Sequence, residues 1–286
     1  MRTVTIVGTG LIGASFGLAL REAGFRGAIL GVSSPPALSE ALAAGSIDRG
    51  VTLAEALPQS GLVFLSQAIG RILDTVRHID PLLRPSPPDM PLITDAGSTK
   101  CEIVDTARRC ISRGQFLGGH PLAGKETRGA SAADPDLFRG RTWVLTPDDP
   151  SEMETPAARE FREWLDRIGA RVTILDCDEH DRVVALTSHL QQLASTALAA
   201  TLAERLDSPA RLAVSGPGAL DMTRLALSSY DLWRDILATN SAHIDRALAL
   251  YIQELEHIRE NLRTRQLQVE FQRAASLAAR LRKAET

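Results

Sequence analysis

A glycine-rich segment near the start of the chain constrains the fold more than any other feature. Residues 3–7 form a short run rich in β-branched side chains, and the sequence Gly-Thr-Gly-Leu-Ile-Gly follows directly at 8–13. Residues 11–23 then have the spacing of apolar side chains that is typical of a helix, and Gly24 is expected to end that helix. A G-x-G-x-x-G loop between a strand and a helix is typical of dinucleotide-binding units, because the start of the helix offers free N–H groups to a pyrophosphate.

The loop residues have separate expected roles. Gly8 permits the tight turn, Gly10 lets the backbone approach the pyrophosphate, and Gly13 lets the helix pack closely on the sheet. Leu11 and Ile12 open the helix beside the phosphates. A glycine turn that binds no ligand is the alternative, and the order strand, loop, helix, second strand makes it the weaker one. We therefore assign all five residues to a cofactor site.

The next part of the chain alternates between strand and helix patterns. We expect strands over 28–32, 62–65, 91–94, 116–119, 142–145 and 172–175, and helices over 36–44, 71–83 and around 161–168. Such alternation predicts a parallel sheet with helices on both faces. The predicted class is therefore α/β, with a doubly wound, Rossmann-type domain at the N-terminus.

The amino-acid composition changes after Asp176. The remaining sequence is rich in Ala, Leu, Arg and Glu, and its spacing predicts long helices over 183–206, 230–263 and 266–282. We therefore expect a dinucleotide-binding domain over 1–175 and an all-helical substrate and dimerisation domain over 176–286.

Composition limits the possible classes of function. The 286 residues are 44% hydrophobic and 23% charged with a formal net charge of −3, so no basic field for nucleic acid is present. The three cysteines are an odd number without a Cys-x-x-Cys spacing, which favours neither a disulfide framework nor a metal site. Neither an export signal nor a bilayer-length apolar run is visible, and we expect a cytoplasmic protein without membrane partners.

The residue after the second strand bears on the choice between NAD and NADP. An acid usually stands there and holds the ribose hydroxyls of NAD. This chain has Ser33 and then Ser34, and a serine does not repel a 2′-phosphate as a carboxylate would. NADP is therefore favoured, while NAD stays open because no arginine follows directly; Arg26 and Arg49 are candidates to reach the phosphate. We assign Ser33, Ser34 and Ser66 to the cofactor site.

Two polar segments follow strands in the first domain. Residues 95–100 (Asp-Ala-Gly-Ser-Thr-Lys) follow one strand, and residues 118–126 follow another and contain a His-Pro-Leu-Ala-Gly sequence. Both are expected to be loops at the carboxyl ends of parallel strands, where ligands bind. Ser98 and His120 could therefore meet beside a nicotinamide. A structural histidine bonded to backbone is the alternative for His120, and for an isolated histidine it would be the better one.

With these segments, the chain resembles the prephenate/arogenate dehydrogenase family of tyrosine biosynthesis. The similar residues run in family order through 8–13, 95–100, 119–124, Glu126, Gly129, 137–138, 180–181, 188–190, 223–224, 233–236 and Asn240. The His-Pro-x-Ala-Gly segment is far more specific than the glycine loop. Gln191 departs from the pattern, because many members have a proline there.

The resemblance implies a hydride transfer coupled to decarboxylation. Hydride leaves C4 of prephenate or arogenate for NAD(P), and carbon dioxide leaves C1, which gives 4-hydroxyphenylpyruvate or tyrosine. His120 would accept a hydrogen bond or proton from the C4 hydroxyl, and Ser98 would align that hydroxyl with the nicotinamide. A homodimer through the helical domain is the family expectation.

The resemblance also implies a set of substrate contacts. Arg224 would bind a substrate carboxylate, His189 would contact the substrate, and Trp233 would form a pocket wall. Gln192 is neutral and offers no acid to the amino group of arogenate, which favours prephenate weakly. Glu126, with Asp221, would form an acidic gate; a solvated surface pair is an equal alternative. The remaining histidines, namely His78, His180, His243 and His257, are expected at the surface or in helix caps.

Two other functions fit parts of the pattern. A β-hydroxyacid dehydrogenase of the same plan usually relies on a lysine in the helical domain, and this chain has no lysine between Lys125 and Lys283. An enzyme acting on an aminated prephenate analogue also stays open. A non-enzymatic NADP sensor would keep the glycine loop but would not need Ser98, His120, His189 and Arg224 together.

Overall fold

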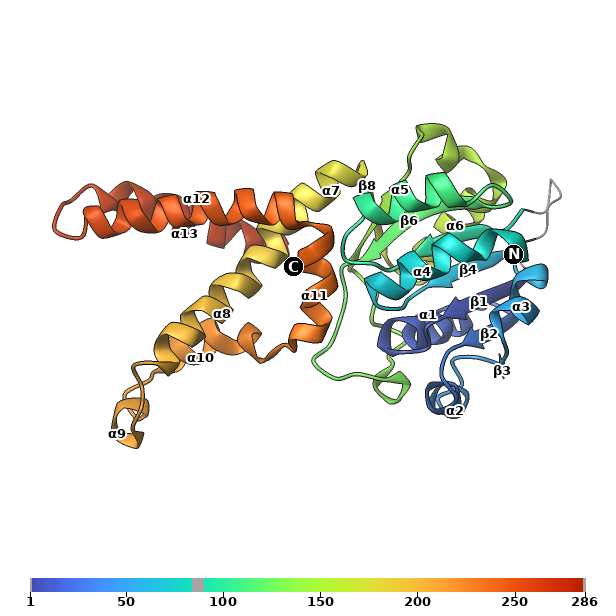
Figure 1. Cartoon of the computed structure of the whole chain (residues 1–286), viewed down its shortest axis with the longest axis horizontal. Helices are drawn as coiled ribbons and strands as arrows, with labels where there is room; N and C mark the ends of the chain where they lie inside the picture. The colour runs from blue at the N-terminus through green and yellow to red at the C-terminus, as the bar shows by residue number, and fades with distance from the viewer. Residues whose placement is uncertain (1, 84–89, 285–286) are drawn as a thin grey trace. The chain divides into compact units, whose positions relative to one another are not determined.

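The computed structural model describes residues 2–83 and 90–284. The chain separates into two compact units, Met1–Asn240 and Ser241–Thr286. The first unit holds an eight-stranded sheet with its flanking helices, and the second holds two long helices (Figure 1). The domain boundary expected at residue 176 stays a prediction.

The sheet has the strand order β3-β2-β1-β4-β5-β6-β7-β8. Strands β1 to β6 run parallel, as predicted, whereas β7 pairs antiparallel with β6, and β8 pairs parallel with β7. From β1 the strand order runs to β2 and β3 on one side and to β4, β5 and β6 on the other, and the gap between β1 and β4 is the switch point where such sheets bind ligands. The strands are β1 Thr3–Val7, β2 Ala28–Val32, β3 Arg49–Gly50, β4 Leu62–Leu65, β5 Leu92–Asp95, β6 Gln115–Pro121, β7 Thr142–Thr146 and β8 Arg171–Ile174.

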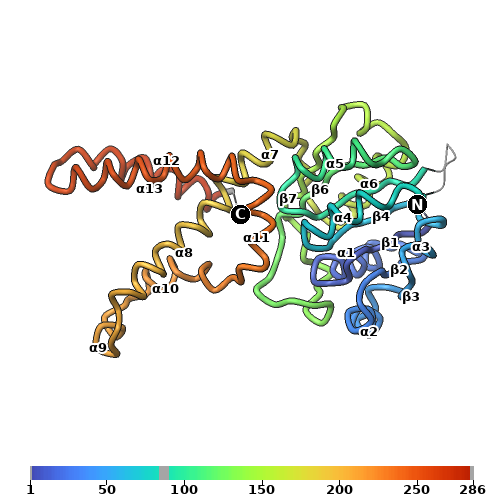
Figure 2. Tube along the Cα trace, in the orientation of Figure 1, coloured from blue at the N-terminus to red at the C-terminus, as the bar shows by residue number. Residues whose placement is uncertain are grey.

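Helices cover both faces of the sheet because the central strands are apolar on both sides. In β4, Leu62 and Phe64 join one core cluster, whereas Val63 and Leu65 join the other. Helices α1 (Leu11–Glu22) and α6 (Pro156–Arg167) cover the first face, and α4 (Ile69–Ile79) and α5 (Cys101–Cys110) cover the second. Figure 2 shows these helices along the Cα trace. The glycine loop and the segment of Ser98 therefore follow strands of a sheet that is covered on both faces.

The helix predicted over 36–44 is present as α2 (Pro35–Ala43) and starts one residue earlier. Several other elements were not predicted: β3, α5 and the short helices α3 (Leu53–Ala56), α9 (Pro209–Leu212) and α10 (Pro217–Thr223). The expected helix over 71–83 is α4 followed by a 3₁₀ turn at Asp80–Leu82. Short elements carry few periodic residues, so their patterns are weak.

The long helices after β8 are interrupted at two places. The run predicted over 183–206 begins earlier, as α7 (Cys177–Val184), passes through a π-helical turn at Ala185–His189, and continues as α8 (Leu190–Ala203). The helix predicted over 230–263 is divided at Asn240, whose φ of −128° and ψ of 24° lie outside the helical region. It forms α11 (Tyr230–Thr239) and α12 (Ser241–Glu260) instead.

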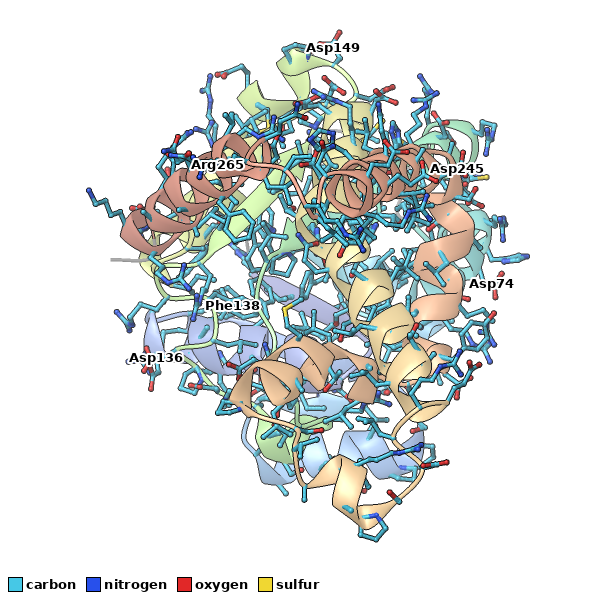
Figure 3. All side chains as sticks on the ribbon, turned by 90° about the vertical axis from the view of Figure 1, so that its left-hand side faces the viewer. Asp74, Asp136, Phe138, Asp149, Asp245 and Arg265 are labelled. Atoms are coloured by element: carbon cyan, nitrogen blue, oxygen red, sulfur yellow. The ribbon has the colours of Figure 1, made fainter. Side chains whose placement is uncertain are left out.

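The second unit is a pair of helices, α12 and α13 (Leu267–Ala284). Arg273 pairs with Glu254 at 3.3 Å, and His257 lies 3.3 Å from Glu270, so polar contacts link the two helices. Large apolar side chains remain exposed on both helices, including Leu250, Ile252, Leu255, Val269, Phe271, Leu277 and Leu281. Within the described residues, no helix combines the length and hydropathy needed to cross a membrane. Figure 3 shows the described side chains, with Arg265 labelled in the connection between the two helices.

Candidate functional site

The glycine loop after β1 is tightly packed at two of its glycines. Gly8 has φ +96°, and a Cβ there would lie 2.9 Å from backbone atoms of Ser66 and Gln67. A Cβ on Gly13 would lie 2.2 Å from the Gly8 carbonyl oxygen and 2.5 Å from Ser66 Oγ. Both positions therefore require glycine, as the sequence predicted, since real Cβ atoms do not approach so closely.

Gly10 differs from the other two glycines. A Cβ there would meet nothing within 4 Å, so the backbone borders open space at the N-terminus of α1. The N–H groups of Leu11 and Ile12 begin this helix and have no intrahelical acceptor. Ser66 Oγ donates to the Gly8 carbonyl at 2.7 Å and holds the loop from β4. These residues fit a dinucleotide, whose pyrophosphate the helix start would hold.

The end of β2 presents hydroxyl groups. Ser33 is half-buried, and exposed Ser34 precedes α2 with extended backbone and without a hydrogen bond from its side chain to the helix start. Arg49 lies in β3 and pairs with Leu30. Arg26 precedes β2 and Ser33 follows it, so the two residues lie at opposite ends of this strand, whose five residues span about 16 Å. The suggestion that Arg26 reaches the Ser33 end is therefore wrong.

His120 lies in strand β6 rather than in a loop, which corrects the sequence prediction. Its backbone pairs with Val144 of β7, and Pro121 pairs with Trp143. The antiparallel partner β7 extends β6 beyond the part that pairs with β5, which ends at Leu117, and holds the backbone of His120 from that one side. Ser98 lies in the connection between β5 and α5, as predicted, and is half-buried.

A buried ion pair joins the segment of Ser98 to the strand of His120. Lys100 Nζ donates to the carboxylate of Asp95 and, at 2.9 Å, to the carbonyl of Gly119; both charged side chains are fully buried. Asp95 also accepts the N–H groups of Gly119 at 3.0 Å and Gly97 at 2.8 Å. Burial lowers the pKa of Lys100, which the Asp95 charge opposes. The sequence analysis singled out residues 95–100 as a candidate loop but did not predict the ion pair between Lys100 and Asp95.

A second polar chain starts at His120 and was missed by sequence reasoning. Nδ1 of His120 lies 2.9 Å from Nε2 of His180, and Nδ1 of His180 lies 2.8 Å from Oδ1 of Asp181. His180 is 0% exposed and Asp181 is 1% exposed, so the expectation of a surface or capping role for His180 is wrong. The misplaced start of the long helix hid the buried face of α7, on which both residues lie with Val184.

Protonation at the site follows from burial. Burial lowers the pKa of His120 well below its usual value, and the nearby His180, Lys100 and His189 lower it further. Burial also lowers the pKa of His189 to about 4, although the Asp181 charge opposes this. Burial raises the pKa of Asp181, but hydrogen bonds from His180 and from the N–H groups of Cys101 and Lys100 outweigh it, and the net shift is downward. His120 is therefore a neutral base at pH 7.

The predicted substrate residues from the later helices lie in two groups. His189 is buried in the π-turn, with its ring T-shaped against Trp233 at 5.8 Å and its Nδ1 3.3 Å from Asn240 Nδ2. Gln192 is buried in α8 and donates to the carbonyl of Leu225 at 2.9 Å. Trp233 packs against the core on the α4 face.

Arg224 and Glu126 form the second group and contact each other. Nη1 of Arg224 lies 3.2 Å from Oε1 of Glu126, and the two side chains are 59% and 84% exposed. A pair this exposed adds little stability, so the guanidinium is free to exchange Glu126 for another carboxylate. The gate proposed for Glu126 and Asp221 stays a prediction.

The arrangement offers specific chemistry. It combines a neutral imidazole on a paired strand, a serine in the segment that Lys100 joins to Gly119, an exposed guanidinium and an open glycine loop, which together suit proton acceptance beside a bound dinucleotide. Among the described residues, no group of three or more His, Cys, Asp or Glu side chains is arranged to hold a metal ion.

Family models match both parts of the chain. The model described as "Prephenate dehydrogenase, nucleotide-binding domain" matches residues 16–174, and the model described as "Prephenate dehydrogenase, dimerization domain" matches residues 176–277. A prephenate dehydrogenase of Lactococcus lactis is 33% identical over 247 residues, which cover 84% of this chain and 65% of that protein. The match thus spans slightly less than two thirds of the relative's length.

Solved structures resemble the whole chain. Prephenate dehydrogenase from A. aeolicus, in complex with hydroxyphenyl propionate and NAD+, is 28% identical with a TM-score of 0.87, over 98% of this chain and 97% of that one. Arogenate dehydrogenase of Synechocystis is 27% identical with a TM-score of 0.80, over 99% and 100% of the two chains. With both family models matched in order around a shared fold, the chain belongs to the prephenate dehydrogenase family.

Proposed function

We propose that this chain catalyses the oxidative decarboxylation of prephenate or arogenate with NAD(P). The observation that carries the proposal is His120, a neutral base fixed in β6 and joined to a buried polar chain on one nitrogen. NAD(P), when bound at the glycine loop, supplies the hydride acceptor. The relatives named as prephenate and arogenate dehydrogenases support the substrate class.

Each residue has a defined task in this reaction. Nε2 of His120 accepts the proton of the C4 hydroxyl while the hydride leaves C4, and Ser98 orients the same hydroxyl. Arg224 releases Glu126 and binds a substrate carboxylate in its place, and Glu126 then lies at the entrance of the substrate site. His189 and Trp233 line the substrate side. Aromatisation of the ring drives the loss of carbon dioxide, so the protein mainly positions the groups.

Gln192 bears on the choice of substrate. It is neutral and buried, and its amide already donates to the carbonyl of Leu225. No acid at this position attracts the amino group of arogenate. We therefore propose prephenate as the preferred substrate.

A direct assay tests the function. Purified protein is mixed with prephenate or arogenate and with NAD or NADP, and absorbance of the reduced nicotinamide is followed. We expect reduction with at least one of the four pairs and a higher kcat/KM with prephenate than with arogenate. Absence of reduction in all four mixtures would exclude the proposed activity.

We also propose that the cofactor site favours NADP over NAD. Ser33 stands at the end of β2, and its hydroxyl does not repel a 2′-phosphate. Changing Ser33 to Asp should reverse the preference and lower the affinity for NADP about tenfold or more, because the carboxylate repels the phosphate. Titration of both cofactors by fluorescence measures this, with Ser39→Asp, at an exposed position inside the following helix α2, as the control. An unchanged NADP preference in the Ser33 variant would refute the argument.

We further propose a homodimer formed through the helices after residue 176. The model matched there is described as a dimerization domain. Exposed apolar side chains on α12 and α13, such as Leu255 and Phe271, need cover of this kind. Light scattering at micromolar concentration measures the mass, and a monomer would contradict the proposal.

A further inference from the structure

We propose that His180 and Asp181 are positioning residues that set the tautomer of His120 and stabilise the proton it receives. The catalytic part rests on the proposed function, whereas the tautomer is a property of the unliganded protein. The proposal starts from one juxtaposition: two imidazoles and a carboxylate in series, from β6 into α7, at 2.9 Å and 2.8 Å.

The direction of each hydrogen bond follows from the buried end of the chain. An ionised carboxylate can only accept, so Nδ1 of His180 carries the proton that Asp181 Oδ1 accepts. A neutral His180 then has a lone pair on Nε2. The contact with His120 is satisfied only if Nδ1 of His120 donates. The remaining nitrogen of His120, Nε2, is therefore left as the acceptor that a general base requires.

Asp181 is held in place by the segment that carries Ser98. Its Oδ1 accepts the N–H of Lys100 at 2.7 Å, and its Oδ2 accepts the N–H of Cys101 at 2.9 Å. Both donors stand at the start of α5, just after Ser98. One carboxylate thus fixes the connection that holds the serine and, through His180, the ring of the histidine. A helix cap alone would not require a buried histidine between the carboxylate and His120.

The balance of the reaction explains why a buried chain suits this site. The C4–H electron pair leaves as hydride, the hydroxyl proton passes to His120 Nε2, and a C=O bond forms at C4. The bond from C1 to its carboxylate then breaks, carbon dioxide leaves, and the electron pair makes the ring aromatic with its oxygen as a phenolate. That oxygen takes the proton back, so no net proton is released. The proton only has to be kept nearby between the two steps.

The chain of His180 and Asp181 can hold that charge without solvent. When His120 becomes an imidazolium, its Nδ1 proton strengthens the bond to His180 Nε2, and the positive charge is shared towards the Asp181 carboxylate. Both residues are buried, so the proton stays inside the protein. This role differs from substrate contact, since neither residue has to touch the substrate.

The tautomer can be measured without substrate or cofactor. In ¹⁵N-histidine NMR spectra of the full chain at pH 7, we expect His120 and His180 to be neutral and protonated on Nδ1. His180→Phe keeps a ring of similar size but removes the acceptor, so His120 should shift towards the Nε2-protonated form. His78→Phe, at an exposed histidine of α4, is the matched control and assigns one further signal. An Nε2-protonated or charged His120 in the parent protein overturns the proposal.

Kinetics separate the orientation of the ring from the effect of the charge. His180→Phe should lower kcat about a hundredfold with KM changed less than about threefold. Asp181→Asn keeps one oxygen that can accept from His180 and Lys100 but loses the charge and the acceptor of the Cys101 N–H, so the tautomer should persist while kcat falls about tenfold. Glu179→Gln removes an exposed pair with Arg182 on the same helix and should leave kcat unchanged.

A double variant excludes a merely structural role. Because His180 acts only through His120, adding His180→Phe to His120→Asn should cause no further loss of kcat, whereas independent structural damage would add. A kcat of His180→Phe within threefold of the parent, or additive losses, refutes the proposal. If the parent protein reduces neither cofactor with either substrate, the proposed function fails instead, and the NMR result still decides the tautomer.

Discussion

Changing His120 to asparagine should lower kcat about a thousandfold, within the range that general-base groups contribute. Asparagine offers no basic nitrogen, so the C4 hydroxyl would have to lose its proton without an acceptor. The fold should persist, because β6 is held by backbone pairing with β7 at this position. The same assay with His78→Asn, an exposed histidine of α4, provides the control. Turnover of His120→Asn at the parent rate would contradict the role of this residue.

The pH dependence of kcat should also reflect the role of His120 as the base. Burial lowers the pKa of His120, so the imidazole remains neutral and active as the pH falls from 8 to about 6. Activity is lost only at lower pH, when the imidazole gains a proton. An acid limb centred near the ordinary histidine pKa of about 6.5 would show that burial does not govern this base.

Changing Lys100 to methionine should lower the free energy of unfolding by about 3–5 kcal/mol, because it leaves the buried Asp95 carboxylate without its cation. The variant also loses the bond to the Gly119 carbonyl, next to His120, so kcat should fall with stability. Urea unfolding followed by tryptophan fluorescence measures the change, since Trp143 lies in the adjacent strand β7.

The matched control for this variant is Arg77→Met. Arg77 pairs with Asp74 at 3.3 Å on the exposed face of α4, and its loss should cost no more than about 0.5 kcal/mol. A loss below about 1 kcal/mol for Lys100→Met would show that the ion pair does not hold the segment of Ser98 against β6.

The predictable parts of this molecule are those whose signal is local. The strand, loop and helix around Gly10 follow from spacing and glycine positions within two dozen residues, and the structure confirms them. The antiparallel β7 was not predicted, because pairing direction depends on a partner more than twenty residues away. For the same reason His120 was expected in a loop rather than in a strand.

The contacts around His120 and Lys100 could not be predicted from spacing. His120 and His180 meet across sixty positions of sequence, and no spacing rule links them. Lys100 and Asp95 are close in sequence, but only the fold buries both charges. A usable signal existed in α7, where His180, Asp181 and Val184 share the buried face of an amphipathic helix. Placing the start of that helix six residues too late concealed it.

The π-turn at Ala185–His189 changes the direction in which the side chains after it point, relative to those before it. In a regular α-helix, two residues nine positions apart face about 180° away from each other, because nine residues make about two and a half turns. His180 and His189 have that separation, yet both are buried, and they lie close enough for His180 to lower the pKa of His189. A π-turn has more residues per turn than an α-helix, so each of its residues turns the side-chain direction by a smaller angle. His180 and His189, which would point to opposite sides of a regular α-helix, can therefore both be buried. The residues of the π-turn thus set the angle between the two histidines. Inserting or deleting one of them would turn one histidine away from the buried side.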